Sequence, residues 1–152
     1  MNTQSIINPE KIHLENVDII KAKIDSEFEA WNYEANEFEY GVSFVNGFNL
    51  QKKLVRCELG INVNKLSIER KTIAESSFTI SYVYRIEDFD DFVEEKEGGI
   101  VFNFDMAATL AGISFSTGRG ILLTRFQGTI FKDFILPVID PKQIVDNKIV
   151  KK

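Results

Sequence analysis

The sequence contains one histidine, His13, and one cysteine, Cys57, among its 152 residues. A single histidine leaves almost no room for histidine-based acid–base catalysis or for a histidine metal cluster. A single cysteine excludes an internal disulfide, which fits a reducing compartment. A Cys57–His13 pair stays open as nucleophile and base, but Cys57 lies on the apolar face of an alternating segment, where a free cysteine behaves as a small buried hydrophobic residue. We therefore expect Cys57 to fill the core.

The chain also lacks an excess of positive charge and a long hydrophobic run. Its formal net charge is −5 and its pI is near 5.0, whereas nucleic-acid-binding proteins rely on a basic surface to displace counterions from phosphate. No segment approaches the roughly 18 apolar residues of a membrane span, and residues 1–9 have neither the charged nor the apolar region of a signal peptide. These absences predict a cytoplasmic protein that binds no nucleic acid and does not insert into a membrane.

Motifs for metal, phosphate or catalytic chemistry are missing as well. The acidic run Asp88-Phe89-Asp90-Asp91 lacks the central glycine and the distal glutamate of the helix–loop–helix calcium motif, so a solvated loop is the better interpretation. Gly118-Arg119-Gly120 is too short for a phosphate-binding loop and indicates a kink or a close-packing site. We expect no enzyme activity, no catalytic residue, no metal and no cofactor.

The chain does contain enough apolar material for the core of one domain, residues 1–152, with 44% hydrophobic residues and thirteen phenylalanines. Apolar side chains alternate with polar ones at the two-residue period of a strand in four segments. These are residues 38–44, 55–63, 78–86 and, less regularly, 20–30. The connections at 49–52 and 64–74 are short and polar, which predicts antiparallel neighbours in a meander. Because one face of each strand is polar, helices must cover the other face.

The helices are expected in the last third of the chain. Asp105 is a candidate N-cap for a helix over residues 106–113. A second helix or a kinked continuation follows over 116–127, where Gly118 and Gly120 each cost about 1 kcal/mol relative to alanine.

The residues that flank these helices also predict where helices begin and end. Gly128 suits the turn that ends the second helix, and Pro141 suits the first position of a last helix through residue 150. Residues 85–105 are strongly acidic, which is typical of a mobile loop, although 100–104 alternate like a short strand. The predicted fold class is α+β, a four-stranded antiparallel meander followed by C-terminal helices packed on one face.

Three motifs in the last third of the chain follow one another in a distinctive order. They are Gly98-Gly99 before a short strand, Gln127-Gly128-Thr129-Ile130-Phe131 after a helix, and the extended Leu136-Pro137-Val138-Ile139 before the last helix. This order resembles the SecB-like family of protein-export chaperones. The chain departs from the family at Phe115-Ser116-Thr117, which replaces an aromatic Pro-Tyr element, and at its end, which lacks a polar tail. A divergent branch, such as the chaperones that control toxin–antitoxin pairs, is equally compatible with these features.

The resemblance implies a holdase chaperone that binds unfolded or extended polypeptides in hydrophobic grooves and keeps them competent for export or folding. It implies a homotetramer, built as a dimer of dimers, and either a SecA-type translocase motor or a toxin–antitoxin pair as a further partner. The candidate client-binding residues are large apolar side chains around the strand, helix and extended segment, although each could equally fill the core or a subunit interface. They are Phe102, Phe104, Phe115, Leu122, Phe126, Phe131, Phe134 and Ile135.

Two other functions stay open. A helix-grip protein would bind an apolar small ligand between a long sheet and one uninterrupted C-terminal helix, and the glycines and prolines listed above argue against such a helix. A non-catalytic interaction subunit would assemble through its sheet edges and helices without binding clients.

Overall fold

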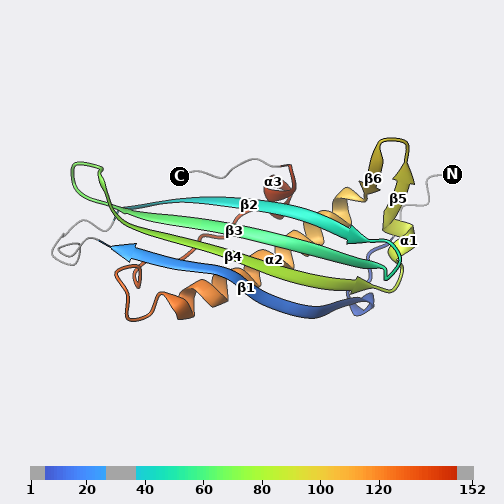
Figure 1. The fold of residues 1–152 in the computed structure, drawn as a ribbon, viewed down its shortest axis with the longest axis horizontal. Helices are drawn as coiled ribbons and strands as arrows, with labels where there is room; N and C mark the ends of the chain where they lie inside the picture. Colours follow the sequence, from blue (N-terminus) through green and yellow to red (C-terminus); the bar gives the residue numbers. More distant parts are fainter. Residues whose placement is uncertain (1–5, 27–36, 147–152) are drawn as a thin grey trace.

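The main element of the computed structural model, which describes residues 6–26 and 37–146, is a four-stranded antiparallel sheet (Figure 1). A short 3-10 turn at Pro9–Lys11 precedes it. The strands are β1 (Ile12–Ser26), β2 (Glu37–Asn49), β3 (Leu54–Leu66) and β4 (Thr72–Ile86). The three regular alternating segments lie within β2, β3 and β4, so the α+β class and the antiparallel sheet are confirmed. Residues 27–30 of the fourth predicted segment lie outside the described residues.

The order of the strands across the sheet is β1-β4-β3-β2, so the predicted meander is wrong for the first strand. Short turns keep β2, β3 and β4 adjacent in sequence order. Ten residues separate Ser26 from Glu37, and this longer connection does not require β1 and β2 to be neighbours. β1 instead pairs along its length with β4, and both strands are 15 residues long. Alternation predicts which side chains face the core but carries no information about which strands are neighbours.

Two irregularities in β1 explain why its alternation is hard to read in the sequence. The pairing of β1 with β4 skips Glu15 and Ile20. Each unpaired residue moves the side chains that follow it to the other face of the sheet. The sequence places Ile20 on one face with Ala22, whereas Ile20 lies at a bulge and is 50% exposed.

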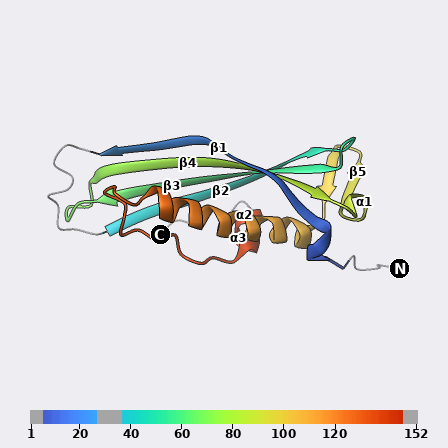
Figure 2. The same ribbon diagram turned by 90° about the horizontal axis from the view of Figure 1, so that it is seen from below.

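One long helix, α2 (Phe104–Arg125), packs on one face of the sheet, on the same side as the short α3 (Pro141–Val145) (Figure 2). α2 begins at Asn103, whose side-chain oxygen accepts a hydrogen bond from the Met106 amide at 2.9 Å. The predicted N-cap at Asp105 is therefore wrong. Asp105 lies in the first turn, where a carboxylate interacts favourably with the helix dipole.

The predicted break in this helix is also wrong, because α2 is continuous for 22 residues through Gly118 and Gly120. A Cβ atom on Gly118 would lie 2.9 Å from Leu59 Cδ2 and 3.3 Å from the Tyr82 hydroxyl oxygen. Gly118 is thus the close-packing site of the Gly118-Arg119-Gly120 motif, and it lets α2 approach β3 and β4. The burial of apolar surface along the whole helix outweighs a glycine cost of about 1 kcal/mol.

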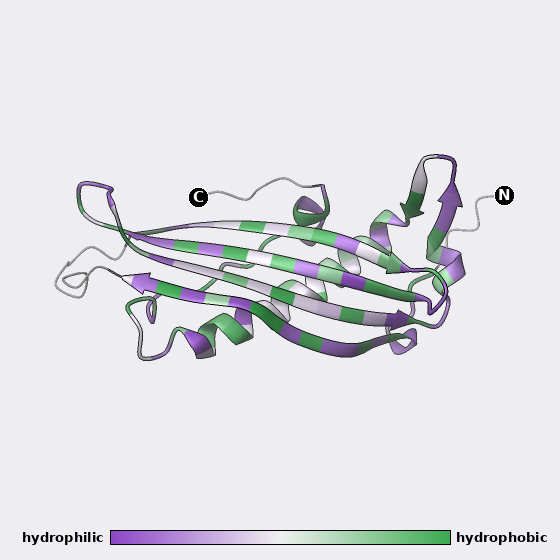
Figure 3. Ribbon diagram, viewed as in Figure 1, coloured by the Kyte–Doolittle hydropathy of each residue, from purple (hydrophilic) through white to green (hydrophobic). Residues whose placement is uncertain are grey.

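By length and composition α2 could also cross a membrane, so the expectation that no segment approaches a membrane span is wrong for this helix. Half of its apolar window is buried inside the fold. This is the packing of a core helix, and Figure 3 shows why the sheet accepts it: hydrophobic and hydrophilic residues alternate along the strands, which leaves one apolar face.

The acidic segment 85–105 is folded rather than a loop. It forms a short helix and a hairpin at one end of the main sheet (Figure 1). These elements are α1 (Phe89–Phe92), β5 (Val93–Lys96) and β6 (Gly99–Phe102). Phe89 and Phe92 are buried, and the Phe102 ring contacts the Phe48 ring edge-on at 5.0 Å. The apolar residues between the acidic ones therefore anchor the segment to the core, and β6 is the short strand that the alternation predicts.

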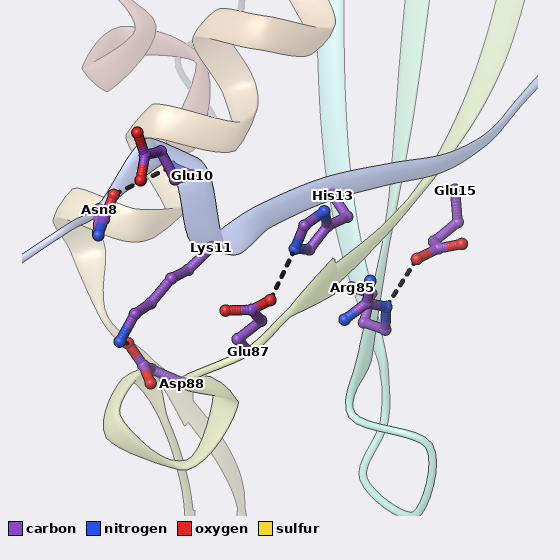
Figure 4. Close-up of polar contacts among 8 residues, drawn as sticks. All are labelled: Asn8, Glu10, Lys11, His13, Glu15, Arg85, Glu87 and Asp88. Atoms are coloured by element: carbon purple, nitrogen blue, oxygen red, sulfur yellow. Dashed lines mark hydrogen bonds and ion pairs between the residues drawn. The ribbon is translucent and has the colours of Figure 1, made fainter.

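Ion pairs connect the acidic segment and β4 to the N-terminal end of β1 (Figure 4). Lys11 Nζ lies 2.8 Å from Asp88 Oδ2, and the hydrogen bond with this carboxylate raises the pKa of Lys11. His13 Nε2 lies 3.1 Å from Glu87 Oε1, and Arg85 Nε donates to Glu15 Oε1 at 2.7 Å. These pairs are exposed to solvent, so they align β1 with β4 more than they stabilise the fold.

Residues 127–139, which we call the strap, connect α2 to α3. Gly128 has the positive φ, +74°, that the turn after α2 requires. Asp140 caps α3 by accepting a hydrogen bond from the Lys142 amide at 3.0 Å, and Pro141 occupies the first helical turn as predicted. α3 ends at Val145 rather than at residue 150, and positions 147–150 lie outside the described residues.

The hydroxyl groups of two core tyrosines have different surroundings beneath α2. Tyr84 shares a hydrogen bond of 2.7 Å with the hydroxyl of Ser114 on α2. The Tyr82 hydroxyl is buried and has no hydrogen-bond partner among the described residues. Burial raises the pKa of both tyrosines, that of Tyr84 to about 12.

Replacing these tyrosines with phenylalanine should have opposite effects. Tyr82→Phe removes a desolvated hydroxyl and is expected to raise the free energy of unfolding by about 1 kcal/mol. Tyr84→Phe leaves the Ser114 hydroxyl without its partner and should lower the free energy of unfolding by about 1 kcal/mol. Urea titrations of the two variants measure both values. Equal losses would show that the Tyr82 hydroxyl is hydrogen-bonded in solution.

Candidate functional site

Two hollows lie on either side of the strap, and both are lined by Phe134 and Ile135. The first, of about 480 Å³, separates the strap from the start of β2. Its lining consists of Glu37, Phe38, Glu39, Tyr40, Arg70, Asp133, Phe134, Ile135 and Pro137. The second, of about 230 Å³, separates the strap from the last turns of α2. Its lining consists of Ser116, Arg119, Gly120, Leu122, Leu123, Phe134, Ile135 and Leu136.

The part of the strap that lies between these hollows, residues 134–138, is extended. Its sequence is Phe-Ile-Leu-Pro-Val. Its side chains point alternately inward and outward, since Phe134 and Leu136 are buried whereas Ile135 is 63% and Val138 80% exposed. Pro137 fixes its own φ and disfavours helix at the preceding residue. The backbone is held by Arg119, whose Nε donates to the Leu136 carbonyl oxygen at 2.7 Å.

Beneath the strap lies a cluster of aromatic rings from β2, from Phe126 at the C-terminal cap of α2, and from the strap itself. The Phe134 ring lies 5.4 Å from Phe38, 5.9 Å from Tyr40 and 6.3 Å from Phe126, measured between centroids. The Phe131 ring stacks on Phe126 at 5.2 Å. We call Phe38, Tyr40 and Phe126 the aromatic socket, because their rings surround that of Phe134.

Charged groups border the first hollow. Glu37 pairs with Arg70, and the Lys65 ammonium lies over the Phe38 ring at 5.8 Å from its centroid. Polar and charged groups at the rim with rings at the base are typical of a surface that contacts polypeptide. Four of the nine residues that line this hollow are charged, and the other five are aromatic or apolar.

The predicted client-binding residues do not gather in one place. Phe131 and Phe134 of the strap are buried, as are Leu122 and Phe126 next to it. Phe115 is buried in the middle of α2. Phe102 and Phe104 lie at the other end of α2, a helix about 33 Å long. Ile135 alone is both exposed and adjacent to the two hollows. Client binding by these residues stays a prediction.

Several residues that line the hollows are absent from the predicted client-binding set. Phe38 and Tyr40 are recognisable in the sequence only as members of an alternating strand, because their place at the sheet edge depends on the strand order. Leu123 is 46% exposed on α2, and Pro137 belongs to the strap's apolar run. The Leu-Pro-Val run is the one signal that could have identified Pro137.

The groups with potential chemistry are dispersed. Cys57 is fully buried, and burial raises the pKa of its thiol to about 12. His13 pairs with Glu87 at the surface instead of with Cys57. Asp88 and Asp90 pair with Lys11 and Lys53. Within residues 6–26 and 37–146, no group of three or more His, Cys, Asp or Glu side chains is placed to hold a metal ion.

The buried thiol and phenols predict a loss of stability at alkaline pH. Because the unfolded chain releases these protons near its ordinary pKa values, about 8.5 for cysteine and 10 for tyrosine, it binds fewer protons than the folded chain up to about pH 12. The free energy of unfolding should therefore be fully retained below about pH 8.5 and fall as the pH rises. Cys57→Ala should make this fall shallower by about 1.4 kcal/mol per pH unit above pH 9, measured by urea unfolding at several pH values. Identical slopes would contradict the shift of the Cys57 pKa.

The continuous helix α2 fits the helix-grip alternative, but the structure has no cavity between this helix and the sheet among the described residues. Leu59, Ile61 and Tyr82 are fully buried beneath α2, and Gly118 leaves no room for even a Cβ atom there. The layer between helix and sheet is therefore packed, and the hollows lie beside the strap instead.

No family model and no curated protein sequence matches this chain. Among solved structures, the chain is similar to the SecB-like chaperone of Mycobacterium tuberculosis, solved in complex with a ChAD peptide from the HigA1 antitoxin. The TM-score is 0.55, the identity is 8%, and the likeness covers 86% of this chain and 91% of that one. The SecB-like fold that the C-terminal motifs predict is confirmed.

Proposed function

We propose that this protein is a holdase chaperone that binds unfolded or extended polypeptides and keeps them competent for export or folding. The observation that carries the proposal is the pair of hollows beside the strap of a SecB-like fold. The hollows combine exposed apolar side chains with a border of polar and charged groups. Neither lining contains a histidine or a cysteine.

A client would bind as an extended segment along the strap and lay its apolar side chains into the hollows. Burying one large apolar side chain contributes about 1.5 to 3 kcal/mol. Two or three such contacts hold a segment without recognition of a particular sequence. Breadth of client choice then follows from the small share of directional contacts.

The homotetramer stays part of this proposal, and the outer face of α2 supports it. Residues 106–124 carry one charged side chain, Arg119, and it is directed to the strap. Ile113 and Leu123 are exposed on this helix, and a shallow hollow of about 710 Å³ lies between α2 and α3. An exposed helix face with apolar residues and few charges is typical of a subunit contact. The edge strand β1 offers a second contact, since Leu14 and Ile24 on it are partly exposed.

The partners that we propose are unfolded polypeptides in the cytoplasm. The similar mycobacterial chaperone was solved with an antitoxin peptide, which supports a toxin–antitoxin pair as the further partner here. A SecA-type motor is the other proposed partner.

The test combines solution mass with aggregation suppression. Purified protein at a near-stoichiometric ratio should slow the aggregation of a chemically unfolded client, and its mass should be that of a tetramer. A tetramer that protects none of several clients would point to the non-catalytic interaction subunit. A monomer with a co-purified apolar ligand would favour small-ligand binding.

A further inference from the structure

The strap has the features that a bound client segment would have. Residues 134–138 are extended and apolar, and their side chains alternate between buried and exposed positions. Between Ile135 and Ile139 the hydrogen bond found to the strap backbone in the described structure comes from a side chain, Arg119, and none from a neighbouring strand or helix. Residues 135–139 of the strap are thus attached by their inserted side chains and by one donor.

The two hollows also suggest what lies under the strap. One wall comes from β2, the opposite wall from α2, and Phe134 and Ile135 border both hollows. Moving the strap outward would join the hollows into one groove. Its floor would be the aromatic socket, which the strap's own Phe134 fills at present.

We propose that the strap is an internal occupant of the client groove and that Arg119 latches it there. This inference rests on the proposed function. Phe134 and Ile135 then belong to the occupant, while Phe38, Tyr40 and Phe126 form the floor that a client segment reaches by displacing it. The latch is one charge-assisted hydrogen bond from a side chain to a carbonyl oxygen, so releasing it removes no hydrogen bond within a helix or a strand.

A peptide with the sequence of residues 131–139, carrying a fluorophore, serves as the probe of the opened groove. Arg119→Met keeps the length and apolar stem of the side chain and removes the donor. Losing a hydrogen bond to a charged group is expected to raise the affinity for this peptide about tenfold. Arg125→Met is the matched control, since it removes the same charge from an exposed position of α2, and its affinity should equal that of the unmodified protein.

Hydrogen exchange separates displacement from binding elsewhere. Adding the peptide to the unmodified protein should speed the exchange of the Lys132 and Phe134 amides, which donate to the Thr129 and Phe131 carbonyl oxygens, because these turns lose their support when the strap leaves the groove. Arg119→Met alone should speed the same amides. Slower or unchanged exchange on peptide addition would overturn the inference.

A second variant tests the socket directly. Phe134→Ala empties the socket, and the peptide should raise the melting temperature of this variant more than a peptide with alanine in place of that phenylalanine does. Equal effects of the two peptides would count against the socket as the site.

The outcomes keep this inference distinct from the proposed function. Aggregation suppression by the unmodified protein, with equal peptide affinities for Arg119→Met and Arg125→Met and no change in strap exchange, would overturn the latch and leave the holdase. Failure of every variant to bind peptide or to suppress aggregation would overturn both.

Discussion

Replacing Gly118 with valine is expected to lower the free energy of unfolding by about 3 kcal/mol. The first added carbon atom would lie 2.9 Å from Leu59 Cδ2 and 3.3 Å from the Tyr82 hydroxyl oxygen. Both of those side chains are fully buried, so neither has room to move aside. The branched side chain would push α2 away from the sheet over the centre of the core. Urea or thermal unfolding of the purified variant measures the loss.

Gly120→Ala is the matched control for this variant. Gly120 lies two residues later in the same helix, and a Cβ atom there would meet nothing within 4 Å. This substitution should raise the free energy of unfolding by about 1 kcal/mol through helix propensity. If both glycine variants were stabilised, α2 would not lie as close to β3 and β4 as the structure places it.

The strands and the long helix differ in how well their sequences predict them. The alternation in β2, β3 and β4 was readable because each apolar side chain packs on one face, and the sequence itself records that face. The predicted helix break at Gly118 is wrong because helix propensity is a local property, whereas the packing of α2 on β3 and β4 outweighs it. The place of β1 could not be read, because pairing with β4 is a contact across the sheet that leaves no local pattern.

The candidate site was only partly predictable for a related reason. The strap was recognisable from its Leu-Pro-Val run, and the fold from the order of motifs around it. Burial was not recognisable, since Phe126 and Ile135 look equally apolar in the sequence although one is 1% and the other 63% exposed. Phe38 and Tyr40 join the strap from a strand about 90 residues earlier in the chain. Such a contact depends on the tertiary fold and has no signature in either segment alone.

Phe126→Ala is expected to lower the free energy of unfolding by about 4 kcal/mol, the larger of the two effects argued here. Its ring contacts Phe78 edge-on at 5.7 Å, stacks on Phe131 at 5.2 Å and borders Phe134 at 6.3 Å. Truncation would leave a cavity among rings that come from β4 and from the strap. Because a domain of this size has a total stability of about 5 to 15 kcal/mol, the variant should be marginally folded.

Leu123→Ala removes an exposed apolar side chain from the last turn of α2, close to the buried Phe126. Leu123 is 46% exposed and lines the hollow between α2 and the strap, so its truncation should change the free energy of unfolding by less than about 1 kcal/mol. It should nevertheless weaken client binding, because the lost apolar contact is made in the groove. Comparing urea unfolding with affinity for an unfolded client therefore distinguishes the two residues. Unchanged stability in Phe126→Ala would contradict its place in the core, since a buried ring that supports the fold cannot be removed without a stability loss.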